Sequence, residues 1–205
     1  MFSVVLLGSC AKEGCTDPQA TNYDADATKD DGSCNPPAIG SFYQGGIIFY
    51  LDGVGGGLVA ASSDQVTWVY PYTGGEWGCF GEEISGANNE GLGYGIENTL
   101  DIVNSNCSPT QQSDNPIAAN FCNALILEGY SDWFLPSKDE LHMMYQNIGP
   151  GNQLSLGNVG NFKEEDYWSS TEIDYNEAWM ENFFNGSQKS VTKLSPVNVR
   201  AIRSF

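Results

Sequence analysis

The chain has 205 residues, of which 40% are hydrophobic and 12% aromatic, enough for one globular domain with a smaller appended segment. Its 26 acidic residues outnumber the eight basic ones and give a formal net charge of -18 at pH 7. Because a surface of that sign repels phosphate backbones and anionic lipid headgroups, we expect no nucleic acid partner.

Residues 1–10 have the pattern that ends a bacterial secretory signal. The apolar run Val4-Val5-Leu6-Leu7 is followed by Gly8-Ser9-Cys10, which resembles the lipobox at which lipoproteins are cut and acylated. This predicts lipidation of Cys10, although no Lys or Arg precedes the run, and a frayed apolar terminus is the alternative. No later apolar run approaches the roughly 20 residues of a membrane span. We therefore expect a secreted or outer cell-surface protein that touches the membrane only through Cys10.

Residues 11–35 are predicted to form a small acidic module that contains Cys15 and Cys34. Oxygen-bearing side chains recur at every second position, as in calcium loops, where roughly six to eight oxygens surround the ion. The candidate metal ligands are Asn22, Asp24, Asp26 and Asp30. Calcium is the expected cofactor, with weak affinity because Ala27 replaces the usual Gly and the twelfth position lacks Glu; a solvated acidic turn is an equally good interpretation. The segment resembles short modules of secreted bacterial surface proteins.

The spacing of the cysteines predicts two disulfides. The segment between Cys15 and Cys34 has no core of its own, so a bridge between them would substitute for burial. Cys107 and Cys122 flank another turn-rich stretch and are the next expected pair, which leaves Cys79 unpaired beside a lipidated amino-terminal cysteine. A zinc-thiolate site is the competing explanation, but the chain has no C-x-x-C spacing and a single histidine.

The main domain is predicted to span residues 40–205, after a proline-rich linker at 36–39. Paired prolines disfavour both helix and strand pairing and make a stiff, extended connection. The first elements of the domain are two strands at residues 45–51 and 57–61, joined by a turn at 52–56. Residues 97–103 and 116–127 have helical patterns.

The clearest helix follows Ser137. Ser137 and Glu140 fit a capping box, and Gly149-Pro150-Gly151 ends the helix. Four apolar residues share one face of it: Leu141, Met144, Tyr145 and Ile148. His142 lies off that face and has no Ser-His-Asp ordering around it, so we expect a surface residue and not a catalytic base.

Residues 167–203 predict a small antiparallel sheet. Aromatic and β-branched residues alternate there with polar ones, and Asn185-Gly186 between two such runs predicts a hairpin with a type I′ turn. Between Ser187 and Asn198 the side chains follow no clear inside and outside pattern. The core therefore does not constrain the side chains of this strand, and they can serve to contact a ligand.

Five motifs follow one another along the chain: Gly129-Tyr130-Ser131-Asp132-Trp133-Phe134-Leu135-Pro136-Ser137-Lys138-Asp139-Glu140-Leu141, Tyr167-Trp168-Ser169-Ser170-Thr171-Glu172, Ala178-Trp179, Asn185-Gly186 and Val199-Arg200-Ala201-Ile202-Arg203. Taken in this order, they resemble the Legionella collagen-like protein C-terminal domain family. The resemblance covers most of residues 40–205. It implies an α+β fold, namely a C-type lectin-like domain with a twisted antiparallel sheet, two to three helices and long loops, similar also to the formylglycine-generating-enzyme-like fold.

The resemblance also implies an extracellular binding or adhesion role. Some members of the family bind sulfated glycosaminoglycans. That ligand disagrees with this chain, because residues 40–205 hold 20 of the acidic residues and only six basic ones and would repel a polyanion.

The terminal hairpin resembles, in addition, the variable region of retroelement-diversified bacterial proteins, where the stretch after Asn-Gly varies on a lectin-like scaffold. Met180, Glu177 and Lys189 cannot arise from Asn codons by adenine-directed change, so active diversification is not expected. The same surface is still the predicted ligand face, with Lys189 and Lys193 as its local positive charge. Its candidate ligand-binding residues are Tyr175, Asn176, Glu177, Ser187, Lys189, Val191, Thr192, Leu194, Pro196 and Asn198.

These patterns predict a non-catalytic ligand-binding or adhesion protein that recognises a glycan or protein partner through its C-terminal sheet and loops. Two other classes stay open: a subunit of a homo-oligomer or surface filament, and a glycan-active enzyme with paired carboxylates. For the enzyme, the candidates are Glu172 with Glu181 or the run Glu164-Glu165-Asp166. A charge run is more often a solvated face, and formylglycine-type chemistry needs late cysteines, whereas none follows Cys122. We expect no catalytic residue.

Overall fold

The computed structural model of the chain describes residues 11–67, 74–107 and 116–205. The chain divides into two compact units between Ala38 and Ile39, directly after the paired prolines. Within the described residues no helix is long and apolar enough to cross a membrane. The lipidation predicted at Cys10 lies outside the described residues.

The first unit is held together by two short strands, a disulfide and side-chain turns. Strand β1 (Glu13–Gly14) pairs in parallel with β2 (Lys29–Asp30). The expected disulfide between Cys15 and Cys34 is present, with the two Cα atoms 4.8 Å apart. Among the described residues of this unit only Cys15 and Ala20 are buried. Because the first unit buries so little apolar surface, it needs a covalent cross-link to offset the conformational entropy lost on folding.

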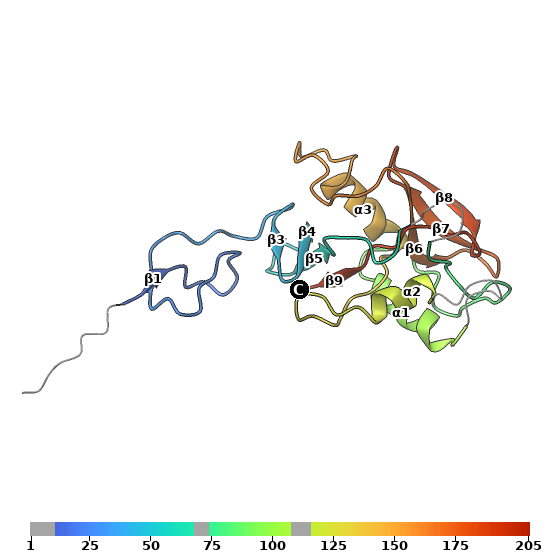
Figure 1. The fold of residues 1–205 in the computed structure, drawn as a ribbon, viewed down its shortest axis with the longest axis horizontal. Coiled ribbons are helices and arrows are strands. Elements are labelled where there is room, and N and C mark those ends of the chain that lie inside the picture. Colours follow the sequence, from blue (N-terminus) through green and yellow to red (C-terminus); the bar gives the residue numbers. More distant parts are fainter. Residues whose placement is uncertain (1–10, 68–73, 108–115) are drawn as a thin grey trace, which may run out of the picture. The chain divides into compact units, whose positions relative to one another are not determined.

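The larger unit begins with a sheet that joins its two ends. Strands β3 (Phe42–Tyr43), β4 (Gly46–Leu51), β5 (Gly57–Ala60) and β9 (Ile202–Ser204) follow one another in the order β3-β4-β5-β9, all antiparallel (Figure 1). The β4–β5 hairpin predicted from the sequence is confirmed. Strand β9 is the last of the chain, yet it pairs with β5, so the carboxyl terminus closes the domain near its beginning.

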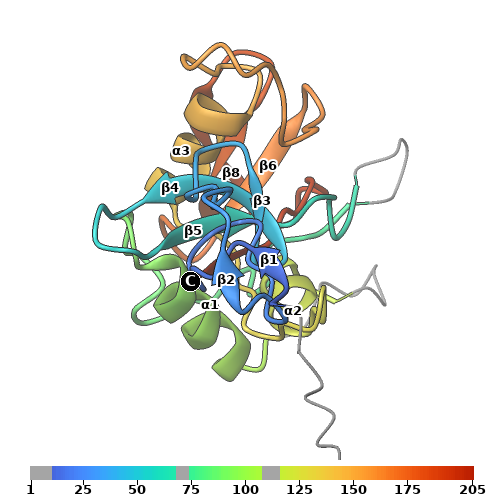
Figure 2. The same ribbon diagram turned by 90° about the vertical axis from the view of Figure 1, so that its left-hand side faces the viewer.

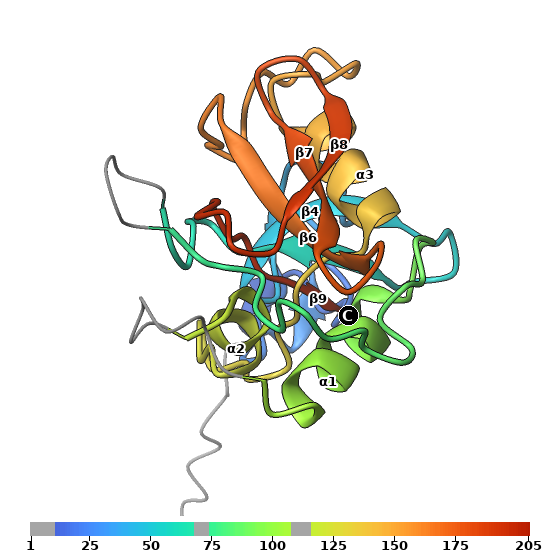
Figure 3. The same ribbon diagram turned by 90° about the vertical axis from the view of Figure 1, so that its right-hand side faces the viewer.

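A second sheet is formed by β6 (Asp166–Glu172), β7 (Glu177–Asn182) and β8 (Ser187–Thr192), in that order and antiparallel (Figure 3). This confirms the predicted carboxyl-terminal sheet as far as Thr192, whereas the end of the predicted segment, at Ile202 and Arg203, belongs to β9 of the other sheet. Strand β8 lies at the edge of the β6–β8 sheet. After β8 the chain turns back, and Val197 and Val199 form isolated bridges to Gly75 and Val66 before β9 begins.

The type I′ turn predicted at Asn185-Gly186 is wrong. Strands β7 and β8 are joined by residues 183–186, and Asn182 O accepts the N–H groups of both Asn185 and Gly186. Only Gly186 of this loop has a positive φ, 71°, whereas a type I′ turn needs two. The reason is that Phe183 is fully buried and packs on Tyr167, so the loop must first carry that ring into the core.

The described residues form three helices: α1 (Gly95–Asn104), α2 (Ala118–Asn123) and α3 (Lys138–Ile148). Figure 2 shows α3 on one side of β4 and β5, and α1 with α2 on the other. The predicted capping box is confirmed, since the Ser137 side chain accepts the Glu140 N–H and the Glu140 carboxylate accepts the Ser137 N–H. Helix α2 is shorter than predicted, because the chain reverses beyond it through a bridge between Leu127 and Tyr130.

The core of the larger unit lies between these layers, and three indole rings anchor it. Trp77, Trp133 and Trp168 are almost fully buried, and each indole N–H donates to a backbone carbonyl. A second apolar cluster lies under α3 and contains Leu141, Met144 and Ile148. The result is a mixed α+β domain with antiparallel sheets, as the sequence predicts.

The second predicted disulfide is wrong. Cys107 is bonded to Cys79, and Cys122 is a buried free thiol. Helix α1 ends just before Cys107 and brings it within 5.0 Å of Cys79 between Cα atoms. Cys122 instead lies on the buried face of α2, where burial raises the pKa of its thiol well above the usual range. The fold thus removes Cys122 from oxidative pairing and leaves it as a packing residue.

Candidate functional site

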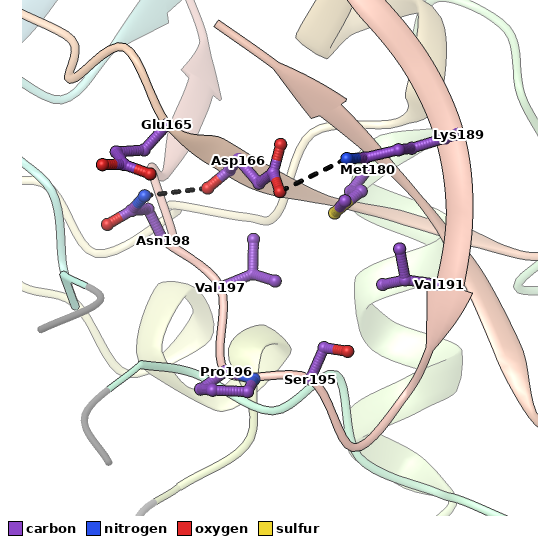
Figure 4. A pocket seen from close by; sticks show the side chains of 9 residues that line it. All are labelled: Glu165, Asp166, Met180, Lys189, Val191, Ser195, Pro196, Val197 and Asn198. Carbon is purple, nitrogen blue, oxygen red and sulfur yellow. Dashed lines mark hydrogen bonds and ion pairs between the residues drawn. The ribbon is translucent and has the colours of Figure 1, made fainter. Parts of the chain in front are cut away.

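A cavity of about 390 Å³ lies on one face of the β6–β8 sheet. We call it the sheet cavity. It is bounded by the start of β6, the middle of β7 and β8, and the segment 195–198 that returns from β8 (Figure 4). Its lining residues are Glu165, Asp166, Met180, Lys189, Val191, Ser195, Pro196, Val197 and Asn198.

The pleat of the sheet decides which side chains enter this cavity. Directly opposed residues of antiparallel strands share a face, and the register pairs Met180 with Lys189. Alternate residues of the same strands point to the other face, where Gln188 Nε2 donates to Lys138 O on α3. One face of the sheet is therefore packed on a helix, and the other forms the cavity wall.

The floor of the cavity is fixed by Asn198, which is buried. Its side-chain amide donates to the backbone oxygen of Asp166 at 2.8 Å, and its backbone carbonyl accepts the Trp168 N–H at 3.0 Å. Val197 is held by paired backbone hydrogen bonds to Gly75. These contacts pin the returning segment against β6, so the cavity has a rigid wall on that side.

Two carboxylates and one ammonium group give the cavity its charge. Asp166 Oδ1 accepts a hydrogen bond from Asn182 Nδ2 at 2.7 Å, and its Oδ2 lies 3.6 Å from Lys189 Nζ. The Lys189 side chain is 50% exposed, so this ion pair is loose and hydrated. The Glu165 side chain is exposed and has no ion pair or hydrogen bond within the described residues. The cavity therefore keeps an excess of negative charge.

The structure separates the predicted ligand residues into three groups. Lys189, Val191, Pro196 and Asn198 line the sheet cavity. Tyr175, Asn176 and Glu177 lie at the β6–β7 turn, where Tyr175 O accepts the Gly81 N–H. The remaining three, Ser187, Thr192 and Leu194, are exposed on β8 and just after it.

Sequence reasoning did not assign Glu165, Asp166 or Met180 to the ligand face. The signal was present in part, since the run Glu164-Glu165-Asp166 leads into the first strand of the terminal sheet, which begins at Asp166. What was missing is the register, which places Met180 between Trp168 and Lys189 on one face. No local sequence pattern predicts this register of β6, β7 and β8.

The surface role predicted for Lys193 is wrong. Its side chain is fully buried, its Nζ lies 2.5 Å from Glu172 Oε1 and donates to Glu82 O at 2.8 Å, and it sits 4.7 Å above the Trp77 ring centre. The Glu172 carboxylate also accepts the Ile84 N–H. Lys193 therefore ties the loop after Trp77 to the sheet and adds no charge to the ligand face.

The two carboxylates considered as an acid/base pair both have structural partners. Glu172 is bound to Lys193, as above. Glu181 is buried, its Oε1 lies 2.8 Å from His142 Nδ1, and its Oε2 accepts from Gln188 Nε2. Burial raises the pKa of Glu172 and raises that of Glu181 to about 6. Neither side chain lines the sheet cavity.

The raised pKa of Glu181 predicts a specific pH dependence of stability. A carboxyl group that binds its proton more tightly when folded contributes stability below its unfolded pKa, near 4.5, and this contribution is lost as the pH rises through about 6. Relative to Glu181→Gln, which cannot ionise, the wild type should lose about 1.5 kcal/mol between pH 4.5 and pH 7. Urea unfolding of both proteins across that range measures the difference. Glu164→Gln, an exposed control, should give a flat difference.

The candidate calcium ligands in the first unit contact other groups. Lys12 Nζ lies 2.8 Å from Asp24 and 3.5 Å from Asp26. Asn22 bridges the backbone of Ser33 and Asn35, and Asp30 accepts the Gly32 N–H. Within the described parts of the chain no three His, Cys, Asp or Glu side chains gather as a metal-binding group. Calcium binding here stays a prediction.

Residues 87–203 match the family model of the Lcl C-terminal domain. The chain belongs to this family. The match covers helices α1, α2 and α3 and the β6–β8 sheet, and it ends within β9. Lcl C-terminal domains suggest a surface or adhesion-type protein. A comparison with curated proteins gave no match.

Proposed function

We propose that this Lcl-family protein is a non-catalytic, extracellular binding or adhesion protein that recognises a glycan or protein partner through the β6–β8 sheet and the loops beside it. The observation that carries the proposal is the sheet cavity, which is walled by four of the residues that the sequence predicts as ligand contacts. Family membership supports the same role. Secretion, with or without lipidation of Cys10, is part of the proposal.

The way the site is built supports recognition. Trp168, Val199 and Ala201 are fully buried and close the fold, while Lys189 and Pro196 beside them reach solvent. Side chains that project from a rigid scaffold can change without unfolding it, which is the usual arrangement of binding surfaces.

The charge distribution argues against a polyanionic ligand. Residues 40–205 contain six basic residues, and five of them pair with a carboxylate: Lys138, Lys189, Lys193, Arg200 and Arg203. The sixth, Lys163, forms no ion pair among the described residues. A sulfated polymer would thus meet little free positive charge and many carboxylates. We infer a ligand that is neutral or positively charged.

A glycan and protein array tests this proposal. The full chain should be applied, at physiological salt, to printed neutral, sulfated and amine-bearing glycans and to purified extracellular proteins. We expect binding to at least one neutral or basic ligand and none to sulfated glycans. The double variant Val191→Ser/Pro196→Ser, which removes apolar contacts from the lining of the cavity and changes no charge, should lose that binding. Ile126→Ser, which changes an exposed apolar residue away from the sheet, is the matched control and should keep it.

Two results would contradict the proposal. One is binding that survives in the double variant at full affinity, which would move the site away from the sheet cavity. The other is turnover of a glycan on the array, seen as loss of the printed sugar, which would make the protein an enzyme.

A further inference from the structure

We propose that the sheet cavity takes up the side chain of a lysine or arginine presented by a basic protein partner. This rests on the proposed function, since it uses the same site, and it adds the chemical class of the ligand. The inference is carried by the shape of the lining, by the state of Asp166 and by the charge of the whole domain.

The lining matches the two parts of a basic side chain. Figure 4 shows Val191 and Val197 facing the middle of the cavity, with Asp166 and Lys189 at one end. A lysine or arginine has a long apolar stem that gains from apolar contact and a charged head that needs a polar partner. The stem would lie between the two valines and the head would reach the carboxylates.

Asp166 is prepared for a cation. One of its oxygens is held by Asn182, which fixes the plane of the carboxylate, and the other faces Lys189 at 3.6 Å. Lys189 is therefore an internal occupant of the cation position, and its half-exposed side chain can swing into solvent when a partner's cation arrives. Glu165, next to it in the chain, supplies a second carboxylate that is not engaged within the described residues.

A protein side chain fits this lining better than a sugar does. Among the described residues that line the cavity none is aromatic, so a pyranose ring would find no flat ring to stack on. The volume, about 390 Å³, is at the small end of ligand pockets and leaves room for one basic side chain together with the residues that flank it. The excess of carboxylates over basic residues in the domain would also steer a basic partner toward it from a distance.

The test uses a fluorescent hexalysine peptide, a hexaarginine peptide, and a hexapeptide of acetyl-lysine that has the same stems without charge. Anisotropy titration with the full chain at physiological salt should show binding of the two basic peptides only. Asp166→Asn and Glu165→Gln should each weaken binding about fivefold, the loss expected for a partly exposed ion pair. Glu164→Gln removes the same charge one residue outside the cavity and should change binding less than twofold.

Two lysine variants separate a specific site from general attraction. Lys189→Ala removes the internal occupant and should strengthen binding at least threefold. Lys163→Ala changes the net charge equally, at a lysine that is exposed and outside the cavity, and should change binding less than twofold. Circular dichroism melting curves should show that every variant is folded.

Equal weakening by Glu164→Gln and Asp166→Asn, or weaker binding after Lys189→Ala, would overturn the inference. So would a chitosan hexamer that binds the cavity more tightly than hexalysine, because the ligand would then be an amino sugar. If hexalysine fails while a neutral glycan binds and is lost in Val191→Ser/Pro196→Ser, only this inference falls and the proposed function stands. If both fail, neither stands.

Discussion

Replacement of Lys193 by methionine is expected to destabilise the larger unit by about 3–5 kcal/mol. The change removes the cation but leaves the Glu172 carboxylate buried and uncompensated, and breaking a buried pair from one side costs about this much. It also removes the donor to Glu82 O, which holds the loop after Trp77. Urea unfolding followed by tryptophan fluorescence measures the loss. Lys163→Met, at an exposed lysine, should change stability by less than about 0.5 kcal/mol.

A second variant distinguishes a lost charge from lost packing. In Lys193→Met/Glu172→Leu both charges are gone and apolar groups of similar size fill the space, so most of the lost stability should return. Lys193→Met alone should also recover stability as the pH falls, because the Glu172 carboxyl, whose pKa is already raised by burial, then takes up a proton. A single variant as stable as the wild type would show that the pair contributes little to the fold.

Replacement of Arg200 by methionine is expected to cost a similar amount, about 3–5 kcal/mol. The Arg200 guanidinium donates to Asp64 at 2.7 Å and to the carbonyls of Ala61 and Gly160 at 2.9 and 2.8 Å, and it lies 4.3 Å from the centre of the Phe162 ring. Asp64 is itself almost buried, so its carboxylate would lose its charge partner. Thermal and urea unfolding of the full chain measure the effect.

Two comparisons test the reason given for Arg200. Arg200→Lys keeps the positive charge but not the fork of donors, so it should still cost about 1.5–3 kcal/mol through hydrogen bonds lost to a charged group. Arg203→Met removes the other arginine of the same motif, whose partner Asp132 is 53% exposed and would stay hydrated. It should cost less than Arg200→Met. A larger loss for Arg203→Met would mean that burial of the partner carboxylate does not decide the effect.

These two arginines explain the Val199-Arg200-Ala201-Ile202-Arg203 motif without any ligand. Val199, Ala201 and Ile202 are fully buried, and each arginine ties the last segment to a distant part of the chain through an aspartate. The motif closes the domain. Both of its positive charges are paired with aspartates, so they are not available to bind a polyanion.

Features fixed by neighbouring residues could be predicted from the sequence. The capping box of α3 needs only a Ser and a Glu three residues apart, and the β4–β5 hairpin needs only two apolar runs around a glycine-rich turn. The Cys15–Cys34 bridge follows from a segment too poor in apolar residues to fold alone. The family itself is recognisable from ordered motifs, because three stretches of them, at residues 133–137, 167–172 and 199–203, are buried in the fold.

Features fixed by residues far apart in the chain could not be predicted from the sequence. Pairing of Cys107 with Cys79 and not with Cys122 depends on where α1 ends in space, and the turn at 183–186 depends on burial of Phe183 against rings from other elements. Lys193 follows an exposed strand in the sequence and reads as a surface cation, but the loop after Trp77 covers it and supplies its partner carbonyl.

Local pattern and motif order are enough to predict the fold class, the family and the carboxyl-terminal half of the candidate site. Which residues share the site depends instead on long-range packing. Strand register put Asp166 and Met180 beside Lys189, and burial withdrew Lys193 and placed Asn198 in the floor. Strand register and side-chain burial are set by packing between residues far apart in the chain. A short stretch of sequence does not include both partners of such a contact, so it cannot predict them.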